Sequence, residues 1–231
     1  MAHVGVSLTL RAQEADMGKM RWELLGTTVG LKVLMAASGL LWTMWVALHM
    51  AGNLLVFGGP EVINGYAAVL QGSPLLWVMR LGLVSLLAVH VVSAVMLTRR
   101  AAAAKGRYRR GLAHREASLA SRTMRWGGLL IFLFLAYHVV HIYGPLHASY
   151  VPGDVHHNLV VGLADPLAGG IYVLATLVFG LHLHHGTWSM FRTLGFERLP
   201  GLRRATAAVS VILTVGYLAP CVAALTGLIS A

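Results

Sequence analysis

Long apolar stretches recur five times along the chain, separated by short and more polar connections. Each stretch is more than 20 residues long and contains no Asp or Glu, and about 20 apolar residues suffice to cross the hydrocarbon core of a bilayer. We therefore expect a single all-α integral membrane bundle over residues 33–231, preceded by an N-terminal segment over residues 1–32. The five transmembrane helices are predicted at Val33–Phe57, Leu75–Thr98, Trp126–His147, Leu167–Phe191 and Ala205–Ser230.

The overall composition agrees with this pattern. Apolar residues make up 57% of the 231 residues and charged residues only 11%, against about 25% charged residues in soluble chains. The one cysteine, Cys221, excludes an internal disulfide, a four-cysteine zinc site and an iron–sulfur cluster held by this chain alone. Glu14, Asp16 and Glu23 interrupt the N-terminal segment, so we do not expect a signal peptide there. A surface helix and a disordered tail remain alternatives for this segment.

The basic residues predict the orientation of the bundle. Seventeen of the 18 Lys and Arg residues fall in the N-terminal segment, between Arg99 and Arg125, or between Arg192 and Arg204. These segments lie on one side of the predicted membrane, and only Arg80 belongs near the other. The positive-inside rule then places the N-terminus in the cytoplasm and the C-terminus outside. The net charge of +10 is thus a topology signal that also suits membrane lipid headgroups, and we expect no nucleic-acid partner.

Four of the five predicted helices carry a histidine deep in the apolar stretch. Ionisable residues at such positions usually face the bundle interior and mark a functional site. At 1.5 Å per residue, His49 and His138 lie about 20–25 Å from the cytoplasmic ends of their helices, and His90 and His182 about 13–15 Å. The histidines therefore sort into an outer pair, His49 with His138, and an inner pair, His90 with His182.

Two imidazoles at one depth suit the two faces of a flat macrocycle. We therefore predict two b-type haems, each with two axial histidine ligands. A tetrahedral zinc site is the alternative metal site, but it needs four convergent ligands at one depth. Buried histidines held by hydrogen bonds for structural reasons are a further alternative. Glycines on these helices suit either a porphyrin edge or close helix packing.

The ordered motifs on these helices make the chain resemble a known family, the five-helix, di-haem cytochrome b anchor subunits of succinate:quinone oxidoreductase and fumarate reductase. The resemblance covers about residues 20 to 230. The motifs that carry it, in order, are His49-Met50-Ala51-Gly52-Asn53, Asn64-Gly65-Tyr66, His90 before Arg99-Arg100, Arg122-Thr123-Met124-Arg125-Trp126, Tyr137-His138 and His182-Leu183-His184-His185-Gly186.

The resemblance implies the same ligand pairs as the depth count. His49 and His138 would hold the haem iron on the outer side, and His90 and His182 the haem iron on the inner side. His141 and His185 lie one helical turn beyond two of these ligands and remain alternatives to them. The chain departs from the family at Gly180, where some relatives have an acidic residue that serves a transmembrane proton route. We therefore do not expect that route here.

Further residues are candidates for contacts with haem propionates or quinone. Arg122, Arg125 and Trp126 are candidates for propionates on the inner side, and Arg80 on the outer side; each Arg also suits a snorkelling topology charge. We interpret His184 as a partner of a propionate, quinone or backbone group. For a quinone pocket or its proton path near the outer face we consider Tyr66, Gln71, Asn64 and Glu61, and for proton relay in the outer loop Asp154, His156 and His157.

The resemblance implies a role in electron transfer between succinate and membrane quinone. FAD and iron–sulfur clusters would reside on a flavoprotein subunit and an iron–sulfur subunit docked on the cytoplasmic face, and menaquinone is the expected quinone. The implied location is the cell inner (plasma) membrane, with a higher oligomer of the complex as an open question. The alternatives are a haem b subunit of a hydrogenase or formate dehydrogenase complex and a haem-free histidine-containing transporter. A cytochrome b of the quinol:cytochrome complex type, with two ligands about fourteen residues apart on each of two helices, does not match.

Overall fold

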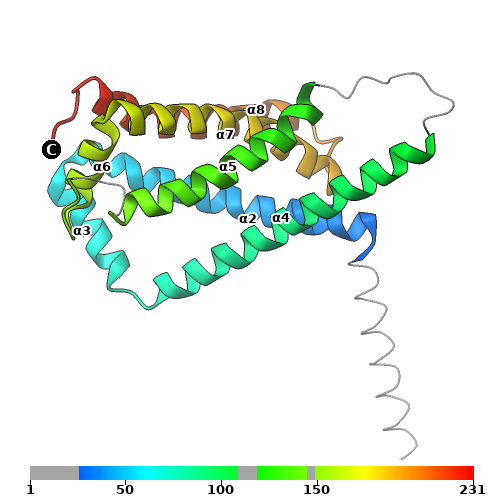
Figure 1. Cartoon of the computed structure of the whole chain (residues 1–231), viewed down its shortest axis with the longest axis horizontal. Coiled ribbons are helices and arrows are strands. Elements are labelled where there is room, and N and C mark those ends of the chain that lie inside the picture. The colour runs from blue at the N-terminus through cyan, green and yellow to red at the C-terminus, as the bar shows by residue number, and fades with distance from the viewer. Residues whose placement is uncertain (1–25, 109–118, 145–148) are drawn as a thin grey trace, which may run out of the picture.

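The computed structural model describes residues 26–108, 119–144 and 149–231, without the side chains of residues 105–108 and 119–122. In this part of the chain the protein is all-α. Five of its helices are long and apolar enough to cross a membrane, as the sequence predicts. The predicted N-terminal segment lies almost entirely outside the described residues. Figure 1 shows the long helices running roughly alongside one another, with their connections gathered at two ends.

The long helices differ from the predicted ranges mainly at their ends. Helix α4 continues about ten residues beyond its predicted end into the basic connection, because Ala101–Ala104 and the flanking basic residues favour a helix. Helix α5 begins earlier and ends before the predicted end at His147, which lies outside the described residues. The five helices are α2 (Thr28–Leu54), α4 (Leu75–Tyr108), α5 (Leu119–Ile142), α7 (Pro166–Thr193) and α8 (Leu202–Leu225).

Two short helices that the sequence analysis did not predict lie at one end of the bundle. After α2, a 3₁₀ turn η1 (Leu55–Gly58) leads through Gly59, whose φ of 89° requires glycine, into α3 (Pro60–Gln71). The second, α6 (Val155–Ala164), is capped by the Asp154 side chain, which accepts the His157 backbone N–H. Asp165 caps α7 in the same way by accepting the Ala168 backbone N–H.

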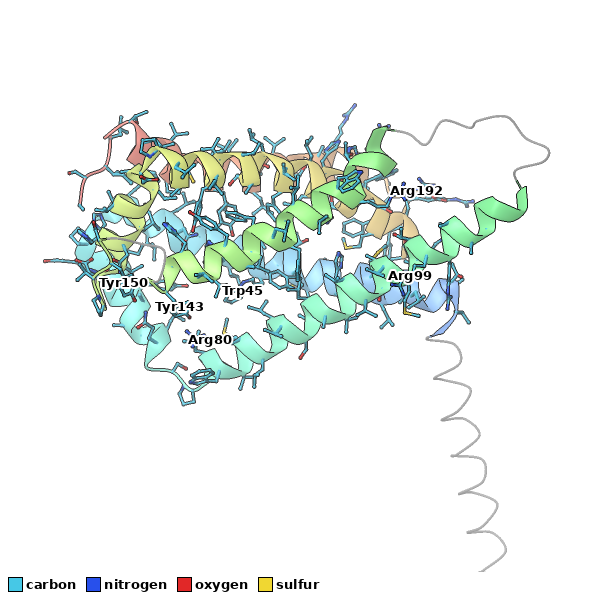
Figure 2. The ribbon with its side chains drawn as sticks, in the orientation of Figure 1. Trp45, Arg80, Arg99, Tyr143, Tyr150 and Arg192 are labelled. Atoms are coloured by element: carbon cyan, nitrogen blue, oxygen red, sulfur yellow. The ribbon has the colours of Figure 1, made fainter. Side chains whose placement is uncertain are left out.

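The basic residues and the short helices occupy opposite ends of the molecule. Figure 2 shows Arg99 and Arg192 at one end, and Arg80, Tyr143 and Tyr150 at the other. We call the first the basic end. The second, which also holds α3, α6 and the C-terminus (Figure 1), is the α3–α6 end. The orientation was predicted from Lys and Arg residues that fall on one side of the membrane, and in the structure Arg99 and Arg192 lie together at the basic end.

Helix α2 is central to the packing. It packs against α4, α7 and α8, whereas α7 packs against α5 and α8. Small residues allow the closest approaches: Gly180 of α7 lies directly against Thr214 of α8, and Gly216 of α8 against Met50 of α2. Such contacts are common between membrane helices, which associate through tight packing rather than through the hydrophobic effect.

Among the described side chains, few apolar ones are buried and many apolar ones lie on the outer surface. Two small buried clusters lie near the α3–α6 end, one of Val56, Ile63 and Val160, the other of Leu163, Cys221 and Ala224. Most of the remaining Leu, Val, Phe and Trp side chains of the long helices are partly or fully exposed. An apolar surface of this extent is expected when lipid rather than water surrounds a bundle.

Candidate functional site

The histidines predicted to form the outer pair lie close together between two helices. The ring centroids of His49 on α2 and His138 on α5 are 6.0 Å apart, with an angle of 80° between the ring planes. Trp45, one turn before His49, stacks parallel to it at 6.0 Å. Tyr217 of α8 contacts the His49 ring from another side at 6.2 Å. Two other helices, α5 and α8, therefore contact the His49 ring, and Trp45 of α2 adds a neighbour from the same helix.

The histidines predicted to form the inner pair have a similar arrangement. The ring centroids of His90 on α4 and His182 on α7 are 6.5 Å apart, with an angle of 66° between the planes. The Nδ1 atom of His90 lies 3.2 Å from the Met35 carbonyl oxygen and 3.3 Å from Ser38 Oγ. Ser38 donates its own hydroxyl proton to the Leu34 carbonyl at 2.7 Å. Both neighbours therefore act as acceptors, so His90 carries its proton on Nδ1 and leaves the Nε2 lone pair available to a metal.

The two pairs lie at different levels along the bundle. The His90 ring contacts α2 at Ser38, and His49 follows Ser38 by eleven residues on the same helix. At 1.5 Å per residue this separation is about 16 Å along the axis. The pair of His49 and His138 is the one nearer to the α3–α6 end, since α2 leads directly into η1 and α3.

The helices that supply each pair are held apart. Among the described residues, neither α2 and α5 nor α4 and α7 pack closely along their backbones, whereas α2 packs on α4 and α7, and α5 packs on α7. The histidine side chains of each pair thus meet between helices that are not packed backbone to backbone.

The separation of the rings fits a bound iron porphyrin. Two metal–imidazole bonds of about 2 Å on opposite faces of one metal place the two ring centroids roughly 6 to 6.5 Å apart. The two observed separations, 6.0 and 6.5 Å, lie at this spacing. His182 Nδ1 is buried without a hydrogen-bond partner among the described residues, so this ring, unlike that of His90, has no protein acceptor there that fixes its tautomer.

Glycines make room for the rings of the second pair. A Cβ on Gly39 would lie 3.2 Å from Cε1 of His90, and a Cβ on Gly128 would lie 3.6 Å from Cε1 of His182. Gly52, which is also on α2, packs instead against the Tyr66 ring. Gly39 and Gly128 thus adjoin the predicted ligands, and Gly52 serves the contact between α2 and α3.

His141 and His185, the alternatives to His138 and His182, have different surroundings from the paired histidines. His141 is buried, stacks on Tyr137 at 5.4 Å, and lies with its Nδ1 3.1 Å from the Tyr172 hydroxyl. His185 contacts His184 edge to face, and His184 Nδ1 lies 3.4 Å from Ser210 Oγ. The geometry therefore favours His138 over His141, and His182 over His185, as the members of the two ring pairs. In the part of the chain that the structure describes, no three His, Cys, Asp or Glu side chains converge.

The residues predicted to contact haem propionates differ in exposure and in partners. Arg80 donates to the Tyr143 hydroxyl at 2.6 Å and lies 5.0 Å above the Trp77 ring, so its guanidinium is already engaged at the α3–α6 end. Arg125 is exposed, and Trp126 is 71% exposed on the outer surface of the bundle. The side chain of Arg122 lies outside the described residues.

Some of the residues predicted to contact quinone or to relay protons hold α3 and α6 together at the α3–α6 end. Asn64 of α3 donates to Asp154 Oδ1 at 3.0 Å and accepts the His156 backbone N–H at 2.9 Å. Both polar atoms of its amide are thus used to join α3 to the start of α6. A quinone contact at Asn64 stays a prediction. The other candidates are distributed as follows: Tyr66, Gln71 and Glu61 are exposed on α3, His156 is buried, and His157 Nε2 lies 3.1 Å from the Ser149 carbonyl oxygen.

The Asp154 carboxyl is the one ionised group of this link. Its pKa is lowered from its ordinary value, first because it accepts the His157 backbone N–H and second because it accepts from the Asn64 amide. It therefore stays ionised at neutral pH and caps α6 as a carboxylate.

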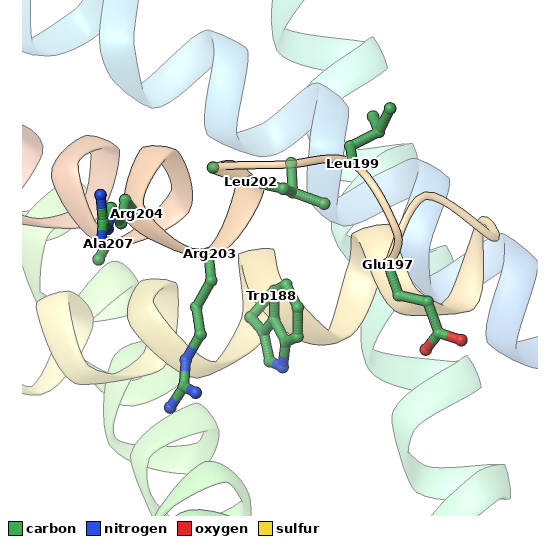
Figure 3. Close-up of a pocket in the computed structure, with 8 residues that line it drawn as sticks. Trp188, Glu197, Leu199, Leu202, Arg203, Arg204 and Ala207 are labelled. Atoms are coloured by element: carbon green, nitrogen blue, oxygen red, sulfur yellow. The ribbon is translucent and has the colours of Figure 1, made fainter.

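A shallow depression at the basic end was not expected from the sequence. It has a volume of about 650 Å³ and lies at the connection between α7 and α8. Figure 3 shows Trp188, Arg203 and Glu197 around it. Glu197 also forms an exposed ion pair with Arg192, at 3.6 Å. The depression is separate from the two histidine pairs and open to the surroundings.

Two residues that sequence reasoning missed belong to the histidine pairs. Ser38 and Tyr172 each contact the Nδ1 atom of a paired histidine. Neither residue stands out in the sequence, because a Ser or a Tyr on an apolar helix has no characteristic spacing to a histidine on another helix.

Comparison of the chain with models of protein families, with curated proteins and with solved structures finds no match.

Proposed function

We propose that the chain is a di-haem cytochrome b subunit that anchors succinate:quinone oxidoreductase or fumarate reductase in the membrane. The observation that carries this proposal is the presence of two interhelical histidine pairs, at ring separations of 6.0 and 6.5 Å, on two levels of a five-helix bundle. Bis-histidine ligation of haem requires this separation, and the ordered motifs of the sequence supply the resemblance to the anchor family.

In this proposal the four histidines would hold the two haems. His49 and His138 would hold one haem b near the α3–α6 end, and His90 and His182 the other, nearer the basic end. Haem supplies one-electron redox chemistry when it is bound. Met35 and Ser38 orient the His90 ring by accepting from its Nδ1, and hydrogen bonding of this kind raises the basicity of a ligating imidazole.

The ends of the bundle suit two different partners. The basic end would face the cytoplasm and dock an iron–sulfur subunit, with the flavoprotein subunit carrying FAD beyond it, because a strongly basic surface attracts an acidic partner. Membrane quinone, menaquinone in our proposal, would bind near the other end, where Tyr66 and Gln71 are exposed on α3. We infer a multi-pass protein of the cell inner (plasma) membrane, with electrons passing between its two levels.

The packing at Gly180 bears on proton movement in this proposal. A Cβ at Gly180 would clash with the Thr214 side chain, so α7 and α8 leave no room for the acidic residue found in some relatives at this position. The absence of a carboxyl group at residue 180 supports a mechanism without that proton route.

Isolation of the intact complex from native membranes tests the proposal. We expect a flavoprotein and an iron–sulfur protein to copurify with the chain in equal amounts, and succinate to reduce its b-type absorption in the visible spectrum. Copurification with a hydrogenase or formate dehydrogenase subunit, with reduction by hydrogen or formate instead, would contradict the assignment to succinate. A colourless chain that purifies alone would favour the haem-free transporter.

A further inference from the structure

A tyrosine on α7 bridges two histidines on α5. The Tyr172 hydroxyl oxygen lies 3.1 Å from Nδ1 of His138 and 3.1 Å from Nδ1 of His141. Its ring is held edge to face against Phe134 at 5.1 Å. Because α5 and α7 pack against each other, the position of this hydroxyl is fixed by the fold and does not depend on a flexible loop.

The chemistry of a hydroxyl limits how this bridge is arranged. A tyrosine hydroxyl has one proton to donate and lone pairs to accept with, and a neutral imidazole protonates only one of its two nitrogens. Ligation of iron through His138 Nε2 requires the proton on Nδ1, so His138 donates to the Tyr172 oxygen. The Tyr172 proton is then directed at His141 Nδ1, which gives a continuous chain from His138 through Tyr172 to His141.

Resting on the proposed function, we propose that Tyr172 is a positioning residue that fixes the tautomer and ring orientation of His138 and tunes the redox potential of the haem at that level. A hydrogen-bond acceptor at Nδ1 makes a ligating imidazole a stronger electron donor, which stabilises oxidised iron. Donation from Tyr172 to His141 strengthens the bridge further, since hydrogen bonds in a chain polarise one another. At the other level the Met35 carbonyl and Ser38 hydroxyl supply the corresponding acceptors to His90.

The test uses Tyr172→Phe in the complete complex, with Tyr137→Phe as the matched control. Tyr137 belongs to the same aromatic cluster, contacting both Tyr172 and His141 through its ring, and its replacement removes a hydroxyl of the same kind without removing the bridge. The readout is a potentiometric titration of the two b-type signals, which are assigned to the levels with His90→Ala. We expect the midpoint potential of the haem at His49 and His138 to rise in Tyr172→Phe, with the other haem unchanged and with both potentials unchanged in Tyr137→Phe.

A second variant keeps the inference testable if Tyr172→Phe loses its haem. His141→Leu removes the acceptor of the Tyr172 proton but retains the bond from His138, so we expect a smaller rise at the same level. Selective loss of that one haem in Tyr172→Phe, with both haems retained in Tyr137→Phe, also supports the positioning role.

Three results would overturn the inference: unchanged potentials in both Tyr172→Phe and His141→Leu, a shift confined to the haem at His90 and His182, or equal shifts in Tyr172→Phe and Tyr137→Phe. Each of these leaves the proposed function standing if the wild-type complex carries two haems and oxidises succinate. A wild-type chain without haem would overturn both proposals. Two haems in a complex of another activity would overturn only the assignment to succinate.

Discussion

The His90 ring of α4 contacts the backbone of α2, with its Nδ1 atom 3.2 Å from the carbonyl oxygen of Met35. This contact joins α4 to α2 at the level where His90 faces His182, and Ser38 reinforces it from the next turn. Since a carbonyl oxygen only accepts, the contact determines which nitrogen of His90 carries the proton. The orientation of one predicted ligand is thus set by the backbone of another helix.

Enlarging Gly39 should displace His90 from this contact. A Cβ at residue 39 would lie 3.2 Å from Cε1 and 3.5 Å from Nδ1 of His90, and the two further methyl groups of valine extend beyond it. Displacement of a group that orients a metal ligand typically lowers affinity 10–100-fold. In Gly39→Val we expect the affinity for the haem at His90 and His182 to fall ~10-fold or more, and the affinity for the other haem to stay unchanged. The haem content of the purified protein measures this difference.

Gly82→Val provides the matched control for that variant. Gly82 is an exposed residue of α4, and nothing lies within 4 Å of a Cβ built there. It should retain both haems. Equal haem content in Gly39→Val and the wild type would show that the space beside His90 is not needed.

The contact between Gly180 and Thr214 predicts a stability effect. Any side chain at residue 180 meets Thr214, and overpacking of this kind typically costs about 1–3 kcal/mol. Gly180→Ala should therefore lower the melting temperature in detergent, and Gly180→Glu should lower it further without restoring a proton route. Gly170→Ala on the same helix, where a Cβ meets nothing within 4 Å, should melt like the wild type. A Gly180→Glu variant as stable as the wild type would contradict the packing described here.

Acidification should weaken the link between α3 and α6. Asp154 has a lowered pKa in the folded protein, so it binds its proton less readily there than in the unfolded chain. The stabilisation it gives is fully present above the unfolded value of about 3.9 and is lost as the pH falls through the folded value. The difference in melting temperature between the wild type and Asp154→Ala should therefore be constant from pH 7 to pH 5 and should shrink below about pH 4.

Asn64→Ala sharpens this prediction. It removes one of the two donors that lower the Asp154 pKa, so the folded pKa should rise towards the unfolded value. The total loss of stabilisation on acidification should therefore be smaller than in the wild type and complete at a higher pH, with the onset unchanged. An acid loss of the same size in Asn64→Ala and the wild type would show that the Asn64 amide does not influence Asp154.

The predicted orientation can be tested by labelling engineered cysteines. Gln71 ends α3 at the α3–α6 end, and Arg198 lies in the connection at the basic end; both are exposed. The native Cys221 is buried, which keeps the background low. In intact cells a membrane-impermeant maleimide should label Gln71→Cys and should label Arg198→Cys only after permeabilisation. The reverse pattern would place the basic end outside.

The sequence was sufficient to predict the long helices and the pairing of the histidines by depth, because both follow from positions along single helices. The apolar runs without Asp or Glu predicted five spans. Counting from their basic ends placed His49 with His138 and His90 with His182, the two pairs whose rings the structure brings within 6.5 Å. Whether these histidines bind iron remains a prediction.

Contacts between helices could not be predicted in the same way. The bridge from Tyr172 to His138 and the use of the Asn64 amide to hold α6 depend on the relative rotation of helices that are distant in the chain. The short helices α3 and α6 were missed because their turns are too few to give a clear periodic pattern. Their capping signals, Gly59-Pro60 and Asp154, are visible in the sequence and could have located their starts.

The most direct test of the account is the reduced-minus-oxidised visible spectrum of the purified wild-type chain after expression with ample haem, together with its haem-to-protein ratio. We expect a b-type spectrum with two haems per chain, and one haem per chain in His90→Ala. A wild-type chain that is folded and shows no Soret absorption would contradict the central claim that the two histidine pairs hold iron porphyrins.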